Sequence, residues 1–195
     1  MKKKQKFKNN FVIDRNDYLI DENIDLDCKN LDAYNSSYFY GEADIVDIYK
    51  IINTIIEENY GQENKNENEN NLSFIDIGSG TGKLILYLYE HSLLNIVGIE
   101  IIKHRYSKSL ELLEQITNNK KINKINYPEF ILDDFKNIYL GNYDILYCCN
   151  LVFSDEDNNI LYTKLINECK GHVILFNYNI KIKSNLLKEF NIKTS

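Results

Sequence analysis

Short apolar runs alternate with segments of helical periodicity from residue 72 onward. Apolar runs of this length predict buried strands, and apolar residues three or four positions apart predict helices that cover a core. The alternation is typical of α/β proteins, so we expect a mostly parallel twisted sheet with helices on both faces. The predicted strands are Leu72–Ile77, Asn95–Glu100, Tyr127–Leu132, Tyr143–Cys149 and Gly171–Asn177, and the predicted helices are Gly82–His91, Lys103–Thr117 and Asp155–Cys169.

A more polar part of the chain precedes this pattern. Residues 1–35 are polar and weakly patterned, whereas Ala43–Glu58 carries isoleucines at helical spacing, which predicts a short N-terminal helical extension. The Asn/Glu-rich residues 61–71 cannot bury a core and predict a flexible loop. We therefore expect one domain over residues 36–195, preceded by a polar extension. Ile180–Ser195 could add a short strand or hairpin.

Charge is distributed unevenly along the 195 residues. The formal net charge of −6 disfavours bare nucleic acid as the main partner, because phosphate binding needs clustered lysines and arginines. The first residues are nevertheless basic, and the simplest interpretation of such a run is a solvated tail. The alternative is a tether that makes a weak contact with nucleic acid, a nucleosome-like particle or an acidic protein face through Lys2–Lys8.

The cysteines and the apolar runs argue against several classes of protein. The cysteines form no Cys-x-x-Cys pair and the histidines do not cluster with them, so no metal site is expected. Without a disulfide framework, a reducing intracellular compartment, cytoplasmic or nuclear, is expected. The basic start lacks the apolar segment of a secretory signal. No apolar run reaches the ~18 residues that span a bilayer. The cysteines are Cys28, Cys148, Cys149 and Cys169.

A glycine-rich loop follows the first predicted strand. The sequence Phe74-Ile75-Asp76-Ile77-Gly78-Ser79-Gly80-Thr81-Gly82-Lys83 places a glycine at every second position directly before a helix. Glycines allow a sharp turn and let a ligand lie against the backbone. The spacing differs from the Gly-x-Gly-x-x-Gly of dinucleotide-binding folds, and the leading glycine of a P-loop is missing.

Acidic residues accompany this loop and indicate the ligand. Glu100 ends the second predicted strand, where a carboxylate accepts hydrogen bonds from ribose hydroxyls. Asp76 would repel a pyrophosphate but suits the cationic amino group of a methionine moiety. The combination favours S-adenosylmethionine (SAM) over a nicotinamide cofactor, and with it a class I methyltransferase with a Rossmann-like fold. Asp134 and Phe135 follow the third strand, where they suit the amino group and ring of adenine.

The fourth predicted strand ends in Cys148-Cys149-Asn150-Leu151-Val152-Phe153, where class I methyltransferases place groups that face the acceptor. The turn lacks the Asn/Asp-Pro-Pro-aromatic motif that is usual in enzymes that methylate base or glutamine amino groups. It also lacks the Pro-Cys nucleophile of cytosine C5 methylation. Both chemistries are therefore disfavoured. Cys148 and Cys149 are expected to be core or strand-end residues rather than nucleophiles.

The order of these motifs resembles the Dot1 family, the non-SET histone lysine methyltransferases. The motifs are Tyr40-Gly41-Glu42, Asp76–Lys83, Gly98-Ile99-Glu100-Ile101, Asp134-Phe135 and Asn150-Leu151-Val152-Phe153-Ser154. The resemblance implies a SAM-dependent protein-lysine N-methyltransferase whose partner is a protein, in this family the histone of a nucleosome. It implies that SAM is bound by Tyr40, Glu42, Asp76, Gly78, Ser79, Gly80, Gly82, Lys83, Glu100, Asp134, Phe135 and Asn150. Asn150 and Phe153 would line the acceptor channel.

Some positions depart from that family. Lys83 stands where Dot1 enzymes often have Gln, and Cys149 and Leu151 replace an Asn and a Phe of the acceptor turn. Two alternatives therefore stay open. One is a class I methyltransferase that acts on a small molecule or RNA. The other is a SAM-binding partner subunit without activity of its own.

Overall fold

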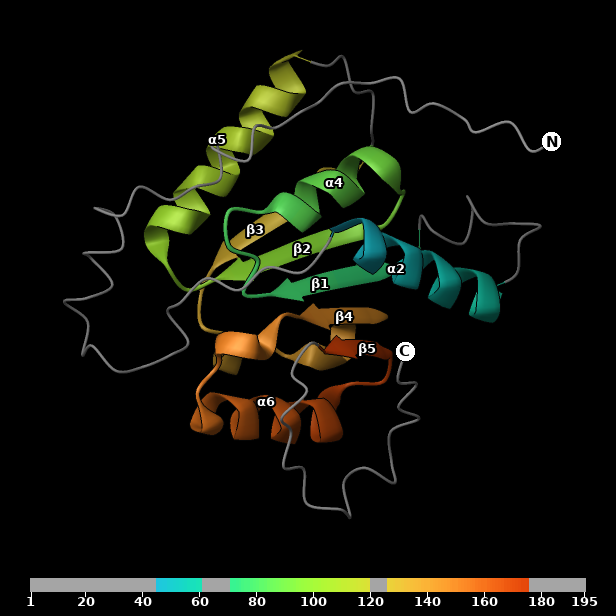
Figure 1. The fold of residues 1–195 in the computed structure, drawn as a ribbon, viewed down its shortest axis with the longest axis vertical. Coiled ribbons are helices and arrows are strands. Elements are labelled where there is room, and N and C mark those ends of the chain that lie inside the picture. Colours follow the sequence, from blue (N-terminus) through green and yellow to red (C-terminus); the bar gives the residue numbers. More distant parts are fainter. Residues whose placement is uncertain (1–44, 61–70, 120–125, 176–195) are drawn as a thin grey trace. The chain divides into compact units, whose positions relative to one another are not determined.

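Five parallel strands form one sheet in the order β3-β2-β1-β4-β5 (Figure 1). The computed structural model describes residues 45–60, 71–119 and 126–175. β1 pairs with β2 on one side and β4 on the other, so the chain crosses the sheet between β3 and β4. In such doubly wound sheets ligands bind at the carboxyl ends of the strands, beside this reversal. The strands are β1 (Ser73–Ile77), β2 (Asn95–Glu100), β3 (Glu129–Leu132), β4 (Ile145–Cys148) and β5 (His172–Leu175).

Helices cover both faces of the sheet, as the sequence predicts (Figure 1). On one face lie α2 (Ile45–Tyr60), α4 (Lys83–His91) and α5 (Lys103–Asn119), and on the other lies α6 (Asp155–Glu168). Because side chains alternate along a strand, Ile75, Ile77 and Ile99 pack with Leu161 and Leu165 of α6. The intervening residues, such as Asp76 and Gly98, belong to the α4 face.

The amino ends of β1 and β4 are joined by one side-chain pair. Oδ2 of Asp144 accepts hydrogen bonds from the backbone N–H of Ser73 at 2.8 Å and from its Oγ at 2.7 Å. The backbone N–H of Asp144 donates to the carbonyl of Ser73 at 3.0 Å. These bonds align the two central strands and satisfy the carboxylate.

Most predicted elements are confirmed, and β2 has the predicted bounds. β1 and β5 begin one residue later than predicted, and β3 and β4 begin two residues later. The two larger differences have physical reasons. β3 begins after Pro128, which has no N–H to donate to a ladder. β4 begins after Tyr143, whose N–H donates to Leu140 in a 3₁₀ turn. Three 3₁₀ turns were not predicted: η3 (Phe135–Asn137), η4 (Leu140–Asn142) and η5 (Asn150–Val152).

Several predictions lie outside the described residues. They concern the polar extension of residues 1–35, the basic run Lys2–Lys8, most of the 61–71 loop and the C-terminal strand or hairpin. The domain boundary therefore stays a prediction. Within the described ranges, no helix is both long and apolar enough to cross a membrane.

Candidate functional site

The glycine loop between β1 and α4 has a conformation that only glycine adopts readily. Gly78, Gly80 and Gly82 have positive φ angles of 77°, 58° and 80°. The N–H groups of Gly78 and Ser79 donate to the carbonyl of Ile99, at 2.9 and 2.8 Å. The turn is therefore held against the carboxyl end of β2. At Gly82 space is also limiting, because an added Cβ would lie 2.7 Å from the ring of Phe130.

Glu100, predicted to hold a ribose, lies buried at the end of β2 and secures the loop. Its Oε2 accepts the N–H of Gly80 and its Oε1 accepts the N–H of Ile102, both at 2.8 Å. Burial raises the pKa of Glu100, while these bonds and the charge of Arg105 oppose the increase. A carboxylate has about four acceptor positions, so Glu100 retains capacity for further donors.

Asp76 lies on the same face of the sheet, one strand away. Its side chain is 4% exposed and lies within the electrostatic influence of Glu100. Burial, and secondarily the charge of Glu100, raise the pKa of Asp76 to about 8. A buried carboxylate in this state is stabilised by a cation. The structure therefore places a buried acidic group with a raised pKa beside the glycine loop.

Buried polar atoms without partners are concentrated in this region. Among the described residues, Oγ of Ser79, Oγ1 of Thr81 and Oδ1 of Asn150 are buried and lack a hydrogen-bond partner. Such atoms are uncommon in folded proteins and call for an explanation such as a ligand. Lys83, the first residue of α4, is half-buried beside them. The predicted ligand residues of the loop thus lie together.

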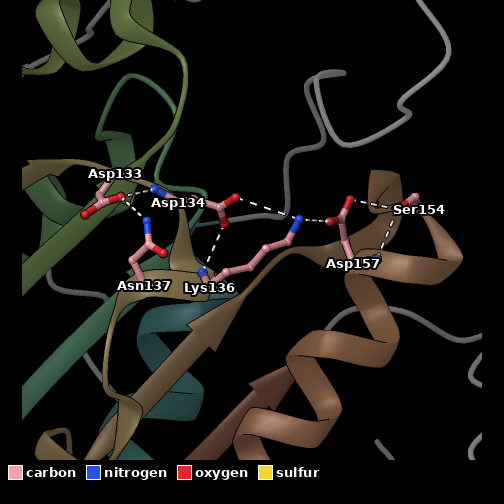
Figure 2. Close-up of polar contacts among 6 residues, drawn as sticks. All are labelled: Asp133, Asp134, Lys136, Asn137, Ser154 and Asp157. Atoms are coloured by element: carbon pink, nitrogen blue, oxygen red, sulfur yellow. Dashed lines mark hydrogen bonds and ion pairs between the residues drawn. The ribbon is translucent and has the colours of Figure 1, made fainter. Parts of the chain in front are cut away.

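The loop after β3 contains the predicted adenine-binding residues and has its own hydrogen bonds (Figure 2). Oδ1 of Asp133 accepts the N–H of Asp134 at 2.7 Å and Nδ2 of Asn137 at 2.8 Å. Oδ1 of Asp134 accepts the N–H of Lys136 at 3.0 Å and so caps the η3 turn. The other oxygen of Asp134 lies 3.7 Å from Nζ of Lys136.

Lys136 also joins this loop to the start of α6. Its Nζ lies 2.7 Å from Oδ1 of Asp157, whose Oδ2 accepts a hydrogen bond from Oγ of Ser154 at 2.7 Å. Figure 2 shows the lysine extended between Asp134 and Asp157. Hydrogen bonding to Asp157 is the largest cause that raises the pKa of Lys136. The loop after β3 and the turn after β4 are therefore connected by an ion pair.

Two phenylalanines bring the same segments together. The rings of Phe135 and Phe153 stack with centroids 5.6 Å apart. A Cβ added to Gly78 would lie 3.8 Å from the Phe153 ring, so Phe153 lies beside the glycine loop. Phe135 is only 8% exposed and packs in the hydrophobic core. Its predicted stacking on adenine stays a prediction.

Asn150, predicted to face the acceptor, is fully buried at the start of η5. Its Nδ2 donates to Oδ1 of Asn158 at 2.7 Å and to Oη of Tyr162 at 3.0 Å. Nδ2 of Asn158 donates to the carbonyls of Phe153 and Ser154, each at 3.1 Å. The turn after β4 is thus anchored to α6.

Sequence reasoning missed some residues at this edge. Ile101 and Leu132, at the ends of β2 and β3, are 44% and 42% exposed. Leu151, which the sequence already marks as an altered position of the acceptor turn, is 47% exposed. Exposed apolar side chains at a strand end are a signal for a ligand or partner surface. Arg105 could have been noticed as a cation soon after Glu100, but its burial at 5% exposure required the structure.

Two predicted ligand residues, Tyr40 and Glu42, lie outside the described residues. The other predicted residues gather at the carboxyl edge of β1, β2, β3 and β4. Their individual roles stay predictions. In the described part of the chain, no group of three His, Cys, Asp or Glu side chains could hold a metal ion.

Two solved structures resemble this chain closely enough to compare folds. Magnesium protoporphyrin IX methyltransferase from Synechocystis PCC 6803 with bound SAM matches with a TM-score of 0.56 and 16% identity, over 88% of this chain and 84% of that chain. The same protein with bound S-adenosylhomocysteine (SAH) matches with a TM-score of 0.52 and 17% identity, over 87% and 78%. No protein-family model and no curated protein matches the sequence.

At this level of sequence identity, these matches show a similarity of fold alone. They lend no support to the Dot1 family in particular, which stays a prediction. The strand order, the glycine loop after β1 and the helices on both faces agree with the resemblance. The chain has the Rossmann-like fold of class I SAM-dependent methyltransferases, which confirms the fold class expected from the sequence.

Proposed function

We propose that the chain is a SAM-dependent methyltransferase that transfers the methyl group to an amine nitrogen, most specifically the side-chain amine of a protein lysine. The observation that carries the cofactor assignment is the buried Asp76, whose pKa is raised by burial and by Glu100, beside a glycine loop. SAM carries a cationic amino group and a cationic sulfur, and either charge would stabilise the ionised carboxylate.

The residues present fit SAM in their chemistry. Asp76 would hold the methionine amino group, and the loop residues Gly78 and Gly80 would lie against the methionine end. Glu100 has the acceptor capacity that two ribose hydroxyls need. Asp134 would accept from the adenine amino group through its second oxygen, which lies 3.7 Å from Nζ of Lys136 and has more than one acceptor position. The unpaired hydroxyls of Ser79 and Thr81 supply further polar contacts.

The residues around the methyl acceptor favour an amine nitrogen that is already neutral when it enters the site. When bound, SAM supplies an electrophilic methyl group, and proximity and orientation can account for ~7–11 kcal/mol of the barrier. Asn150 is hydrogen-bonded to Asn158 and Tyr162, which are neutral. Burial raises the pKa of Tyr162, so its phenol keeps its proton. These groups can orient an amine but cannot deprotonate it, so a lysine must enter neutral, with Phe153 as an apolar wall that lowers the pKa of the amine.

Charge around the acceptor turn supports a basic protein over RNA. In residues 133–137 and 150–157 the one basic side chain, Lys136, pairs with the buried Asp157, whereas four further acidic side chains are exposed or half-buried: Asp133, Asp134, Asp155 and Glu156. Acidic surfaces repel phosphates and attract lysine-rich segments. The resemblance to Dot1 enzymes supports the same acceptor. A histone tail is a natural candidate because it is basic and rich in lysine.

Transfer of radiolabel from methyl-labelled SAM would test the proposal. The purified chain would be incubated with nucleosomes, free histones, total RNA and a cell lysate. We expect label on a protein band, located at lysine by mass spectrometry, and no label with Asn150→Ala. Label on RNA or on small molecules would contradict the lysine acceptor. Binding of SAM without any transfer would instead indicate the partner-subunit alternative, which the altered positions Cys149 and Leu151 favour.

A further inference from the structure

The carboxamide of Asn150 is held by two side chains of α6. Both N–H groups of its Nδ2 are used, one by Asn158 and one by Tyr162. The Asn150 side chain is fully buried, and its Oδ1 has no hydrogen-bond partner. The polar atom of Asn150 that remains unused is therefore an acceptor.

This orientation is dictated by the backbone of the turn. Nδ2 of Asn158 donates to the carbonyls of Phe153 and Ser154. Carbonyl oxygens only accept, so Asn158 must present its nitrogen to them and its Oδ1 to Asn150. That oxygen also only accepts, so Asn150 must in turn present its own nitrogen. The two amides can therefore not flip independently, and Oδ1 of Asn150 stays the unpaired atom.

Burying this oxygen without a hydrogen-bond partner makes the folded state less stable. A buried polar atom without a partner has lost its hydrogen bonds to water and gained none in the protein. Because the atom is shielded from solvent, a donor brought to it gains a hydrogen bond without displacing one to water. Phe153, whose carbonyl starts the chain of hydrogen bonds, lies beside Gly78 of the glycine loop. The oxygen therefore belongs to the turn that contacts the proposed cofactor site.

We propose that Asn158 and Tyr162 are positioning residues that hold Oδ1 of Asn150 as the hydrogen-bond acceptor for an N–H of the amine substrate. The proposal rests on the proposed function and deepens it. Asn158 fixes the orientation and Tyr162 occupies the second N–H. Neither touches the substrate. Both act only through Asn150, so their effects must disappear when Asn150 is removed.

A pair of ligands tests this without requiring the natural acceptor. SAH has a neutral sulfur, whereas sinefungin is a SAM analogue with a primary amine on the carbon that replaces the methylated sulfur. The amine lies where the methyl group points, toward the acceptor. The quantity to measure by calorimetry is the ratio of the dissociation constants of SAH and sinefungin. We expect the wild-type chain to prefer sinefungin by about tenfold, the size of one hydrogen bond to a charged donor.

Variants then identify the residues that produce this preference. Asn150→Ala should abolish it, and Tyr162→Phe and Asn158→Ser should reduce it by about threefold or more. In the Asn150→Ala background, the same two substitutions should leave the ratio unchanged. A merely structural role would lower stability in both backgrounds but would not produce this non-additivity. Tyr143→Phe and Asn159→Ser are matched controls, because Tyr143 packs on the same core and Asn159 is the exposed neighbour of Asn158.

The outcomes distinguish failure of the positioning role from failure of the proposed methyltransferase function. An unchanged ratio in Tyr162→Phe and Asn158→Ser, with wild-type melting curves, would overturn the positioning role. A Tyr162→Phe effect of equal size in the wild-type and Asn150→Ala backgrounds would also overturn it. Failure of the wild-type chain to bind either SAH or sinefungin would overturn the proposed function, and this inference with it. If Asn158→Ser does not fold, Tyr162→Phe alone decides, since it removes a single oxygen.

Discussion

Two aspartates at opposite ends of the central strands differ in their hydrogen bonds and in their electrostatic surroundings. Asp144, at the amino end of β4, accepts two hydrogen bonds from Ser73 and lies where no ligand is proposed. Asp76, near the carboxyl end of β1, is buried, and burial and the charge of Glu100 raise its pKa. The same sheet can therefore satisfy a carboxylate where it serves structure. At the other end, the raised pKa of the buried Asp76 fits the proposed binding of a cation.

The largest effect is expected from the substitution Asp76→Asn, which keeps the shape of the side chain and removes its charge. We expect SAM affinity to fall on the order of 1000-fold, because loss of one member of a buried charge pair costs several kcal/mol. Calorimetry with SAM would measure the change. Unchanged affinity would mean that the cation of the cofactor does not meet this carboxylate.

Stability should respond to pH through Asp76 in the opposite sense to an ordinary carboxylate. The folded pKa of about 8 exceeds the ordinary value, so between the two the unfolded chain is ionised while the folded chain keeps its proton. Stability should therefore be highest below pH 4 as far as this group is concerned, and be lost as pH rises toward 8. The raised pKa of Glu100 acts in the same direction.

The difference between variant and wild type isolates this contribution. Asp76→Asn should melt on the order of 10 °C higher than wild type at pH 8, with a smaller difference at pH 5. Thermal melts followed by circular dichroism would measure both. Equal melting temperatures at pH 8 would show that the buried carboxylate carries no such penalty.

At the other end of the sheet, Asp144→Ala should do the reverse. Loss of the two hydrogen bonds from Ser73 should lower stability by about 2 kcal/mol, which corresponds to about 4–8 °C for a chain of this size. SAH affinity should stay unchanged, because the proposed site is at the opposite edge. A large loss of SAH affinity at unchanged stability would contradict the division between the two ends.

The smallest effect concerns the ion pair between the loop after β3 and α6. Lys136→Met should weaken SAH binding by about two- to fivefold, because Lys136 is one-third exposed and such pairs contribute about 1 kcal/mol or less. Lys164→Met is the matched control, since it removes an ion pair with Glu168 elsewhere on α6. Equal effects of the two substitutions on SAH affinity would show that the Lys136 bridge does not position the adenine loop.

Sequence could predict features that are local. The apolar run Asn95–Glu100 and the glycine spacing determine a buried strand and a turn with positive φ, and both are confirmed. The segment between β3 and β4 could not be predicted, because its 3₁₀ turns depend on the cap by Asp134 and on packing of Phe135 and Leu140.

The candidate site could also be predicted only in part from the sequence. That Asp76, Glu100 and Asn150 gather follows from parallel strands ending at one edge. The burial of Asp76 beside Glu100, and the anchoring of Asn150 by Asn158 and Tyr162, depend on contacts between segments distant along the chain. Spacing alone cannot distinguish a satisfied polar residue from an unsatisfied one.

The most direct test of SAM binding at this edge is a heteronuclear NMR titration of the labelled chain with SAH, followed at glycine amides. We expect the signals of Gly78, Gly80 and Gly82 to shift, whereas Gly141 and Gly171, near the amino ends of β4 and β5, stay in place. Saturating SAH without shifts in the three loop glycines, or with shifts confined to Gly141 and Gly171, would contradict the account.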